Sequence, residues 1–246
     1  IDYLIEDYAD EWLTKAMFHY RWSYAPDIHK AGQMLPRWNN STASEADIAE
    51  QAKTITRRQV SRLSYVGSNA LTSATIENSF KSFLGKLDKH LNLYAFILGN
   101  RPSASDFAIY GQLTAMALFD PTPAQIIIET TPRIYAWTES MEDLSGYESF
   151  DDDWLDLECL PETLVALLEE IGRLYLPYLV ANDAAVRAGI DTLETELDGR
   201  AWTQNPFPYQ SKCLGWIKEG FAGLSDHDAN QLRTQLRHTG IIELLA

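Results

Sequence analysis

Cysteine, basic charge and long apolar runs are scarce in this sequence, and each scarcity excludes a class of protein. Its 246 residues include two cysteines, Cys159 and Cys213, which are too few for a disulfide scaffold and stand at no metal-ligand spacing. Lys and Arg number 20 against 35 Asp and Glu, giving a net charge of −15. That balance argues against a nucleic-acid partner and a polybasic membrane-surface role. We therefore expect two reduced thiols in a cytoplasmic protein.

No stretch has the roughly 18 consecutive apolar residues that a membrane-spanning helix needs. The longest apolar segment, 107–119, contains Gly111, Gln112 and Thr114 and ends at Asp120. The sequence therefore predicts no membrane partner. Apolar residues are nevertheless plentiful, at 46% hydrophobic and 11% aromatic, so the chain is expected to build a sizeable core.

The familiar catalytic patterns are also missing. The chain has no Gly-rich phosphate loop, no G-x-S-x-G elbow and no H-E-x-x-H motif, and its five histidines are scattered. One acidic segment, 148–158, is centred on Asp151, Asp152 and Asp153. It is compatible with a divalent-cation loop, but it lacks the alternating spacing and the glycine of a calcium loop, which favours a loop with helix-start charges. The sequence therefore assigns no catalytic residue, and we expect no metal site.

Helical periodicity dominates the chain, so the fold class expected is mainly α. Apolar residues recur at three- and four-residue steps, and Glu11 and Lys15 form an i,i+4 pair on the first helix. The segment 27–40 is expected to be irregular because of its Gly, Pro and Asn residues, and Asp120–Pro123 is expected to end the helix that precedes it. The second helix is expected to start at Thr42 or Ser44 and to end at about residue 65. The other predicted helices are 2–24, 71–90, 107–118 after the N-cap Ser103, 131–141, 161–188 with an interruption at Pro177, 209–222 and 225–240.

The period changes to two over 192–203. Residues 192–197 alternate, Asp198-Gly199 is a type I′ turn signal, and 200–203 alternate back. A small β-hairpin is predicted there, within an otherwise helical C-terminal region.

A resemblance to a known family rests on three motifs. Residues 96–113 read F-I-L-G-N-R-P-S-A-S-D-F-A-I-Y-G-Q-L, in which Ser103 and Asp106 have the spacing of a capping box. D-P-T-P at 120–123 and T-P-R-I-Y-A-W at 131–137 follow. In order and spacing these motifs resemble the all-helical C-terminal domain of the glutathione S-transferase superfamily.

The resemblance implies a particular domain organisation. Residues 1–146 are expected to form the transferase-like helical bundle, with the helix after the capping box at its centre. Residues 147–246 are expected to form a helical extension, containing the hairpin at about 192–203, packed on the same domain. The family implies dimerisation through the first two helices.

The same resemblance implies that this chain is one half of a two-domain enzyme. Family members bind glutathione with an N-terminal thioredoxin-like domain, which carries the catalytic Ser, Tyr or Cys, and no matching pattern occurs here. We therefore expect the natural chain to begin upstream of Ile1, with glutathione as co-substrate only if that domain exists. The helical half supplies the pocket for the electrophile, and its first helix implies Tyr3, Asp7, Tyr8 and Glu11 as the cleft wall.

Other interpretations stay open at this point. The carboxylates Glu6, Asp7, Asp10 and Glu11 are expected either to line a pocket or to form a solvated helix face. The whole domain is alternatively a non-catalytic scaffold for protein association. A third interpretation is a cation-binding protein that uses Asp151–Asp153.

Overall fold

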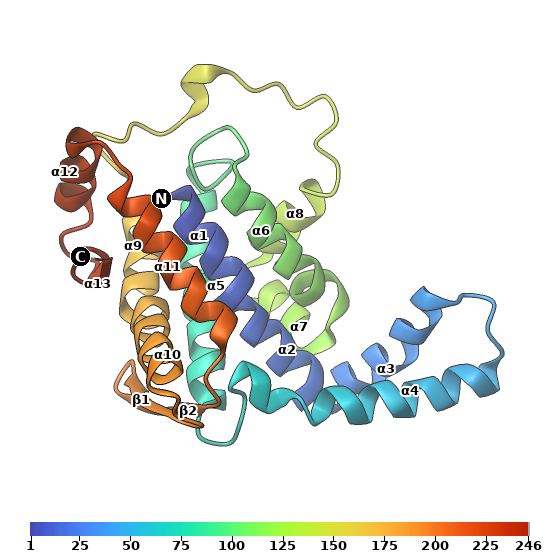
Figure 1. Ribbon diagram of the computed structural model, residues 1–246. Helices are drawn as coiled ribbons and strands as arrows, with labels where there is room; N and C mark the ends of the chain where they lie inside the picture. The colour runs from blue at the N-terminus through green and yellow to red at the C-terminus, as the bar shows by residue number, and fades with distance from the viewer. Residues whose placement is uncertain (246) are drawn as a thin grey trace.

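The structure is a computed structural model that describes residues 1–245, and it is mainly helical with one small antiparallel sheet (Figure 1). This confirms the predicted fold class at the level of secondary structure. The elements are α1 (Asp2–Tyr8), α2 (Thr14–Ser23), α3 (Ala25–Asn39), α4 (Glu45–Val60), α5 (Ser73–Leu91), α6 (Ala104–Leu113), α7 (Pro121–Thr130), α8 (Pro132–Ser140), α9 (Glu162–Glu170), α10 (Leu176–Ala188), β1 (Leu193–Leu197), β2 (Arg200–Gln204), α11 (Pro208–Ala222), α12 (Asp226–Gln235) and α13 (Ile241–Leu245).

The first helix crosses the centre of the molecule, between α6 and α11 (Figure 1). It consists of α1, a π-helical turn at Ala9–Leu13 and α2, so the chain is helical from residue 2 to residue 23, as predicted. Large side chains along it are fully buried, among them Tyr8, Trp12 and Tyr20. Because this helix is surrounded by its neighbours, its position is set by packing on several sides.

One hydrophobic core joins the two halves of the chain. The Trp12 ring of the first helix lies 5.5 Å from the Tyr178 ring of α10 and 5.4 Å from the Trp202 ring of β2, centroid to centroid. Aromatic pairs at such distances add to the free energy gained by burying their apolar area. The segment from α9 to α11 is thus packed directly on the first helix.

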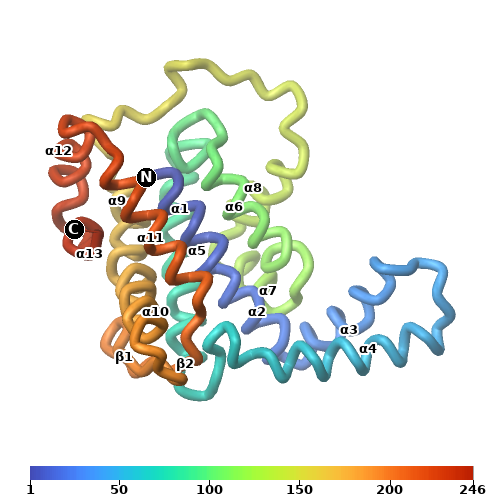
Figure 2. Tube along the Cα trace, viewed as in Figure 1, coloured from blue at the N-terminus to red at the C-terminus, as the bar shows by residue number. Residues whose placement is uncertain are grey.

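The expectation of irregular structure at 27–40 is wrong, because α3 spans Ala25–Asn39. Pro26 lies in the first turn, where its missing N–H has no helical partner to lose. Gly32 lets α3 lie close to α4, since a Cβ at that position would be 2.8 Å from Thr56 Oγ1. The resulting α3–α4 hairpin projects away from the rest of the molecule (Figure 2).

The break predicted at 120–123 is confirmed, because the preceding helix ends at Phe119 with Asp120 as its C-cap. The helix that follows, α7, was not predicted, and Pro121 occupies its first turn. At the C-terminus the helix predicted for 225–240 ends at Gln235 as α12, and a further helix that was not predicted, α13, follows. Gly240, with φ of +74°, separates them.

The C-terminal hairpin agrees with the sequence pattern, but the interruption expected at Pro177 in the long helix before it is absent. β1 and β2 pair antiparallel through a turn at Asp198 and Gly199, both with positive φ, as a type I′ turn requires. The helical segment 162–188 is continuous, and a π-helical turn at Ile171–Tyr175 precedes Pro177. The extra residue of that turn accommodates the proline, which cannot donate a backbone hydrogen bond.

Ser103 and Asp106 lie at the start of α6, where the sequence places them. The Asp106 carboxylate accepts hydrogen bonds from the Ser103 N–H at 2.9 Å and from the Ile97 N–H, also at 2.9 Å. Burial raises the pKa of Asp106 to about 6, against the lowering effect of these bonds. α6 buries Ile109 completely but leaves Phe107 about half exposed, so it is not surrounded on all sides as expected.

Within residues 1–245, no helix combines the length and the apolar character needed to cross a bilayer.

Candidate functional site

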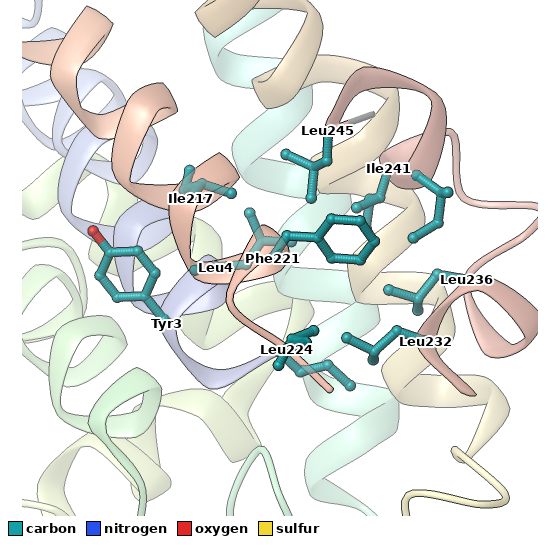
Figure 3. Close-up of a pocket in the computed structure, with 12 residues that line it drawn as sticks. Tyr3, Leu4, Ile217, Phe221, Leu224, Leu232, Leu236, Ile241 and Leu245 are labelled. Atoms are coloured by element: carbon teal, nitrogen blue, oxygen red, sulfur yellow. The ribbon is translucent and has the colours of Figure 1, made fainter. Parts of the chain in front are cut away.

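An apolar pocket of about 240 Å³ lies where the start of the first helix meets α11, α12 and α13 (Figure 3). Apart from the Tyr3 hydroxyl, the described side chains that line it are apolar. A pocket of this composition accepts an uncharged apolar group, which gains free energy by leaving water. Its lining consists of Ile1, Tyr3, Leu4, Ile217, Gly220, Phe221, Leu224, Leu232, Leu236, Ile241, Ile242 and Leu245.

Tyr3 is the first of the four predicted cleft residues, and it does lie at this pocket. Its side chain stands at the edge of the lining group, with the hydroxyl pointing away from Leu232 and Leu236 (Figure 3). Tyr3 is 44% exposed. Burial of part of the ring, with the nearby Asp7 carboxylate, raises the pKa of Tyr3, so the phenol stays protonated at neutral pH.

Asp7 lies one turn further along, out of the pocket and largely buried. The Tyr175 hydroxyl donates a 2.5 Å hydrogen bond to Asp7 Oδ2. Burial raises the pKa of Asp7 to about 6, although this hydrogen bond works in the opposite direction. Burial, followed by the charges of Asp7 and Glu11, raises the pKa of the adjacent Cys213 thiol. Cys213 is therefore a neutral thiol at pH 7 and a poor nucleophile.

Tyr8 belongs to the core. Its ring packs 5.8 Å from the Phe83 ring and 5.7 Å from the Tyr175 ring, between centroids. The side chain is 1% exposed, and its hydroxyl has no hydrogen-bond partner among residues 1–245. Tyr8 does not line the apolar pocket.

Glu11 lies on the same side of the helix as Asp7 and faces α11. Gln210 Nε2 donates a 2.8 Å hydrogen bond to Glu11 Oε2, and the Tyr178 hydroxyl donates to Gln210 Oε1. Burial raises the pKa of Glu11, against the effect of Gln210 and Lys15. Glu6 and Asp10, by contrast, stay at least partly in contact with solvent. Of these four carboxylates Asp7 is buried, Asp10 is exposed, and Glu6 and Glu11 are intermediate.

Lys15 also belongs to this region, and its burial was not predicted from the sequence. The sequence pattern identifies it only as the i,i+4 partner of Glu11, and in the structure it is 2% exposed. Lys15 Nζ donates to Tyr178 Oη at 3.2 Å and to Gln204 Oε1 at 3.3 Å, and lies 4.4 Å from the centroid of the Tyr178 ring. Burial lowers the pKa of Lys15 to about 7, with Glu11 opposing.

Spacing along one helix could not show this arrangement, because Tyr178 and Gln204 are more than 160 residues away in the chain. The signal that was present is the high aromatic content around Lys15, since Trp12, Tyr20 and Trp22 leave this part of the helix little exposed surface. A lysine within such a segment is buried along with its neighbours.

The acidic segment has a different arrangement from a cation loop. Asp151 Oδ1 accepts from Arg101 at 3.1 Å, and Asp153 Oδ2 accepts from the Phe150 N–H at 2.7 Å. Within the described part of the chain, His, Cys, Asp and Glu side chains form no group of three or more that could hold a metal ion.

Protein-family models, curated proteins and solved structures were all compared with this chain, and none of them matches it. Its function is therefore inferred from the residue pattern and from the geometry above.

Proposed function

We propose that this chain is the substrate-side helical part of a glutathione S-transferase-like protein. In this proposal residues 1–146 form the transferase-like bundle, and the pocket at the start of the first helix holds an apolar electrophile. A thioredoxin-like domain upstream supplies glutathione, whose thiolate attacks the electrophile. The observation that carries the proposal is the apolar pocket that Tyr3 and Leu4 of the first helix help to line.

The residues of this chain contribute binding and exclusion of water. The leucines and isoleucines of α11, α12 and α13 remove the apolar part of the substrate from solvent, and Tyr3 places a protonated phenol at the rim. Asp7 and Glu11 lie outside the pocket and position the first helix, because their hydrogen bonds to Tyr175 and Gln210 hold it against the π-helical turn before α10 and against α11. Activation of the thiol by a lowered pKa belongs to the partner domain.

Occupation of the pocket is tested with N-phenyl-1-naphthylamine, an uncharged aromatic molecule whose fluorescence rises in apolar surroundings. Gly220 lines the pocket, and a Cβ added there meets no atom within 4 Å, so Gly220→Leu fills the space without a backbone clash. We expect the wild type to bind the dye and Gly220→Leu to bind at least about tenfold more weakly.

Gly215→Leu is the matched control. Gly215 lies in the same helix, also has no atom within 4 Å of an added Cβ, and is outside the pocket. It should leave the affinity for the dye unchanged. Equal loss of affinity in both variants, or no binding by the wild type, contradicts the pocket.

The upstream domain is tested by the intact mass of the protein isolated from its natural source. We expect a mass well above the 27.9 kDa of residues 1–246. A natural protein of 27.9 kDa that begins at Ile1 contradicts this proposal.

A second candidate function, a scaffold for protein association, has its own supporting observation. Phe207, Tyr209 and Trp216 are 44%, 49% and 43% exposed and lie next to one another, with centroid distances of 6.4 Å and 5.9 Å along the series. Exposed aromatic clusters are typical of protein contact sites. The scaffold predicts a defined partner whose binding is lost in Trp216→Ala. Retention of the chain on glutathione resin, competed by free glutathione, would contradict it.

We also propose that the protein is a homodimer through its first two helices, as the family resemblance implies. Sedimentation equilibrium should then give twice the mass of one chain. A single-chain mass at micromolar concentration contradicts the dimer.

A further inference from the structure

A second cavity, of about 570 Å³ and open to solvent, lies at the other end of the first helix. Three polar side chains from separate segments meet in its wall: His19 of α2, Ser68 of the loop before α5, and Glu77 of α5. Ser68 Oγ is 2.8 Å from His19 Nδ1, and His19 Nε2 is 3.3 Å from Glu77 Oε1. A hydroxyl, an imidazole and a carboxylate thus form a continuous hydrogen-bonded series.

The direction of the hydrogen bonds follows from the charge of Glu77. Burial alone raises the pKa of Glu77, but hydrogen bonds from Tyr24 and His19 and the charge of Lys81 outweigh it and hold that pKa below its ordinary value. An ionised carboxylate has no hydrogen to donate, so His19 Nε2 carries the ring proton. Burial lowers the pKa of His19, which keeps the ring neutral at pH 7. Nδ1 is therefore a free base, and the Ser68 hydroxyl donates to it.

The loop that carries Ser68 is held in place on both sides. Gly67 has φ of +73°, and a Cβ there would lie 2.7 Å from Trp202 Cζ2, so a glycine is required for the loop to pass β2. Asn69 Nδ2 donates to the Thr203 carbonyl at 3.0 Å, and the Ser68 N–H donates to the Leu63 carbonyl at 3.0 Å. These contacts fix the Ser68 side chain next to His19.

The surroundings of Ser68 favour an apolar acyl compound. Ile28, Val60 and Leu63 line the same cavity, which gives an apolar surface beside the hydroxyl. Ser73, the first residue of the 19-residue helix α5, also lines it, together with Ala70 in the turn before that helix. Negative charge that develops on a reacting carbonyl oxygen is stabilised near a helix N-terminus. The net charge of −15 disfavours anionic substrates.

We propose that Ser68, His19 and Glu77 form a nucleophilic site that hydrolyses uncharged carboxylic esters with apolar acyl groups. Ser68 is the nucleophile, His19 the general base and Glu77 the carboxylate that orients the imidazole. This proposal is independent of the transferase-like function, because the two cavities share no lining residue.

The reaction balances with water as the second reactant. Ser68 Oγ bonds to the ester carbonyl carbon while its proton moves to His19 Nδ1, and the tetrahedral intermediate then expels the alcohol, which takes that proton. Water next attacks the acyl-serine ester and gives its proton to His19. Collapse of the second intermediate breaks the bond to Oγ, and His19 returns the proton to Ser68. The products are the carboxylic acid and the alcohol.

Ser23 is the competing hydroxyl, since its Oγ lies 3.3 Å from the same Nδ1 atom. Ser68 is closer to the ring nitrogen and is held by the loop, whereas Ser23 is exposed at the end of α2. The geometry therefore assigns the nucleophile to Ser68, and an experiment that identifies the modified serine separates the two.

The test uses a fluorophosphonate probe, which forms a covalent bond with activated serines and releases fluoride. The folded wild-type chain is labelled, digested and mapped by mass spectrometry. We expect the adduct on Ser68, and its loss when the chain is unfolded in urea before labelling. No adduct on Ser68 of the folded chain, or an adduct on Ser23 in its place, overturns the assignment.

Hydrolysis of p-nitrophenyl butyrate gives the second readout. Ser68→Ala and His19→Gln should each lower the rate at least about 100-fold, the usual contribution of a nucleophile or general base. Ser64→Ala is the matched control, because Ser64 precedes the same loop but is exposed and does not line the cavity. Its rate should equal that of the wild type. Equal rates for Ser68→Ala and the wild type overturn the proposal.

Discussion

Two charged residues of the central helix, Asp7 and Lys15, lie inside the molecule, which the sequence pattern did not predict for Lys15. Both belong to the central helix, whose neighbours α10 and α11 cover the side that carries them. Burial disfavours the charged form of each group, which raises the pKa of the acid and lowers that of the base. The stability of the fold therefore depends on pH through these two residues.

Lys15→Met is expected to stabilise the protein most at pH 7 and below. The folded chain binds the Lys15 proton with a pKa of about 7, against 10.5 in the unfolded chain, so wild-type stability rises with pH across this interval. The advantage of the methionine variant should thus shrink from pH 7 to pH 9, by up to about 1.4 kcal/mol per pH unit. Urea unfolding at several pH values measures it.

Lys53→Met, on the exposed face of α4, is the control for Lys15. Its stability relative to the wild type should not vary with pH over the same interval. A constant difference between Lys15→Met and the wild type from pH 7 to pH 9 would show that Lys15 is charged in the folded protein throughout.

For Asp7→Asn the gain in stability over the wild type should increase with pH, whereas for Lys15→Met it decreases. The pKa of Asp7 is about 6 when folded and 3.8 when unfolded, so the folded state holds the proton more tightly and wild-type stability from this group falls as pH rises from 4 to 6. Asparagine can still accept from Tyr175 but does not ionise. Its stabilisation relative to the wild type should grow over that interval and then level off.

Thermal or urea unfolding between pH 4 and pH 7 tests this, with Asp10→Asn as the control. Asp10 is exposed on the same helix, so its effect should be much smaller. A pH dependence no larger for Asp7→Asn than for Asp10→Asn would contradict a buried, weakly acidic Asp7.

Helices were predictable where periodicity and capping signals agreed, and they were missed where proline was taken only as a breaker. α4, with Ser44 as its N-cap, and the hairpin at Asp198-Gly199 follow from local chemistry. α3 and α7 were missed because each begins with a proline in its first turn. The π-helical turns depend on packing between helices. The spacing of apolar residues along one segment carries no information about that packing.

The candidate site was less predictable than the helices and strands, because it too depends on packing between segments far apart in the chain. Of the four expected cleft residues, Tyr3 lies at the pocket, and the side chains that complete it belong to α11, α12 and α13 at the opposite end of the chain. Which distant segments cover a given helix face is decided by tertiary packing. No short motif marks Leu232, Leu236 or Ile241 as neighbours of Tyr3.

Gly172→Ala should detach the last helix from the bundle. A Cβ at Gly172 would clash with the Thr239 carbonyl oxygen, a backbone atom that cannot move without shifting α13. We expect a loss of about 2 kcal/mol in the free energy of unfolding, and weaker binding of N-phenyl-1-naphthylamine because Ile241 and Leu245 help to line the pocket.

Gly85→Ala is the matched substitution, within α5, where an added Cβ meets no atom within 4 Å. It should leave dye binding intact and change stability by no more than about 1 kcal/mol, in the stabilising direction. If Gly172→Ala behaves like Gly85→Ala in both measurements, the close packing of α13 on the helix before α10 is wrong.

For the molecule as a whole, the first helix is the element that relates its two cavities. Tyr3 lies at the apolar pocket and His19 at the second cavity, about 24 Å apart along a helix that rises 1.5 Å per residue. Substitutions at one cavity are therefore expected to leave the other unchanged. Loss of dye binding in Gly220→Leu and loss of ester hydrolysis in Ser68→Ala should be separable.

The most direct test of the central claim is glutathione conjugation by the complete natural polypeptide, measured with 1-chloro-2,4-dinitrobenzene. We predict conjugation whose KM for this electrophile rises at least about tenfold in Gly220→Leu and stays unchanged in Gly215→Leu. Absence of conjugation by the natural protein, or an equal KM in all three proteins, would contradict the claim that this chain is the substrate-side half of a glutathione S-transferase-like enzyme.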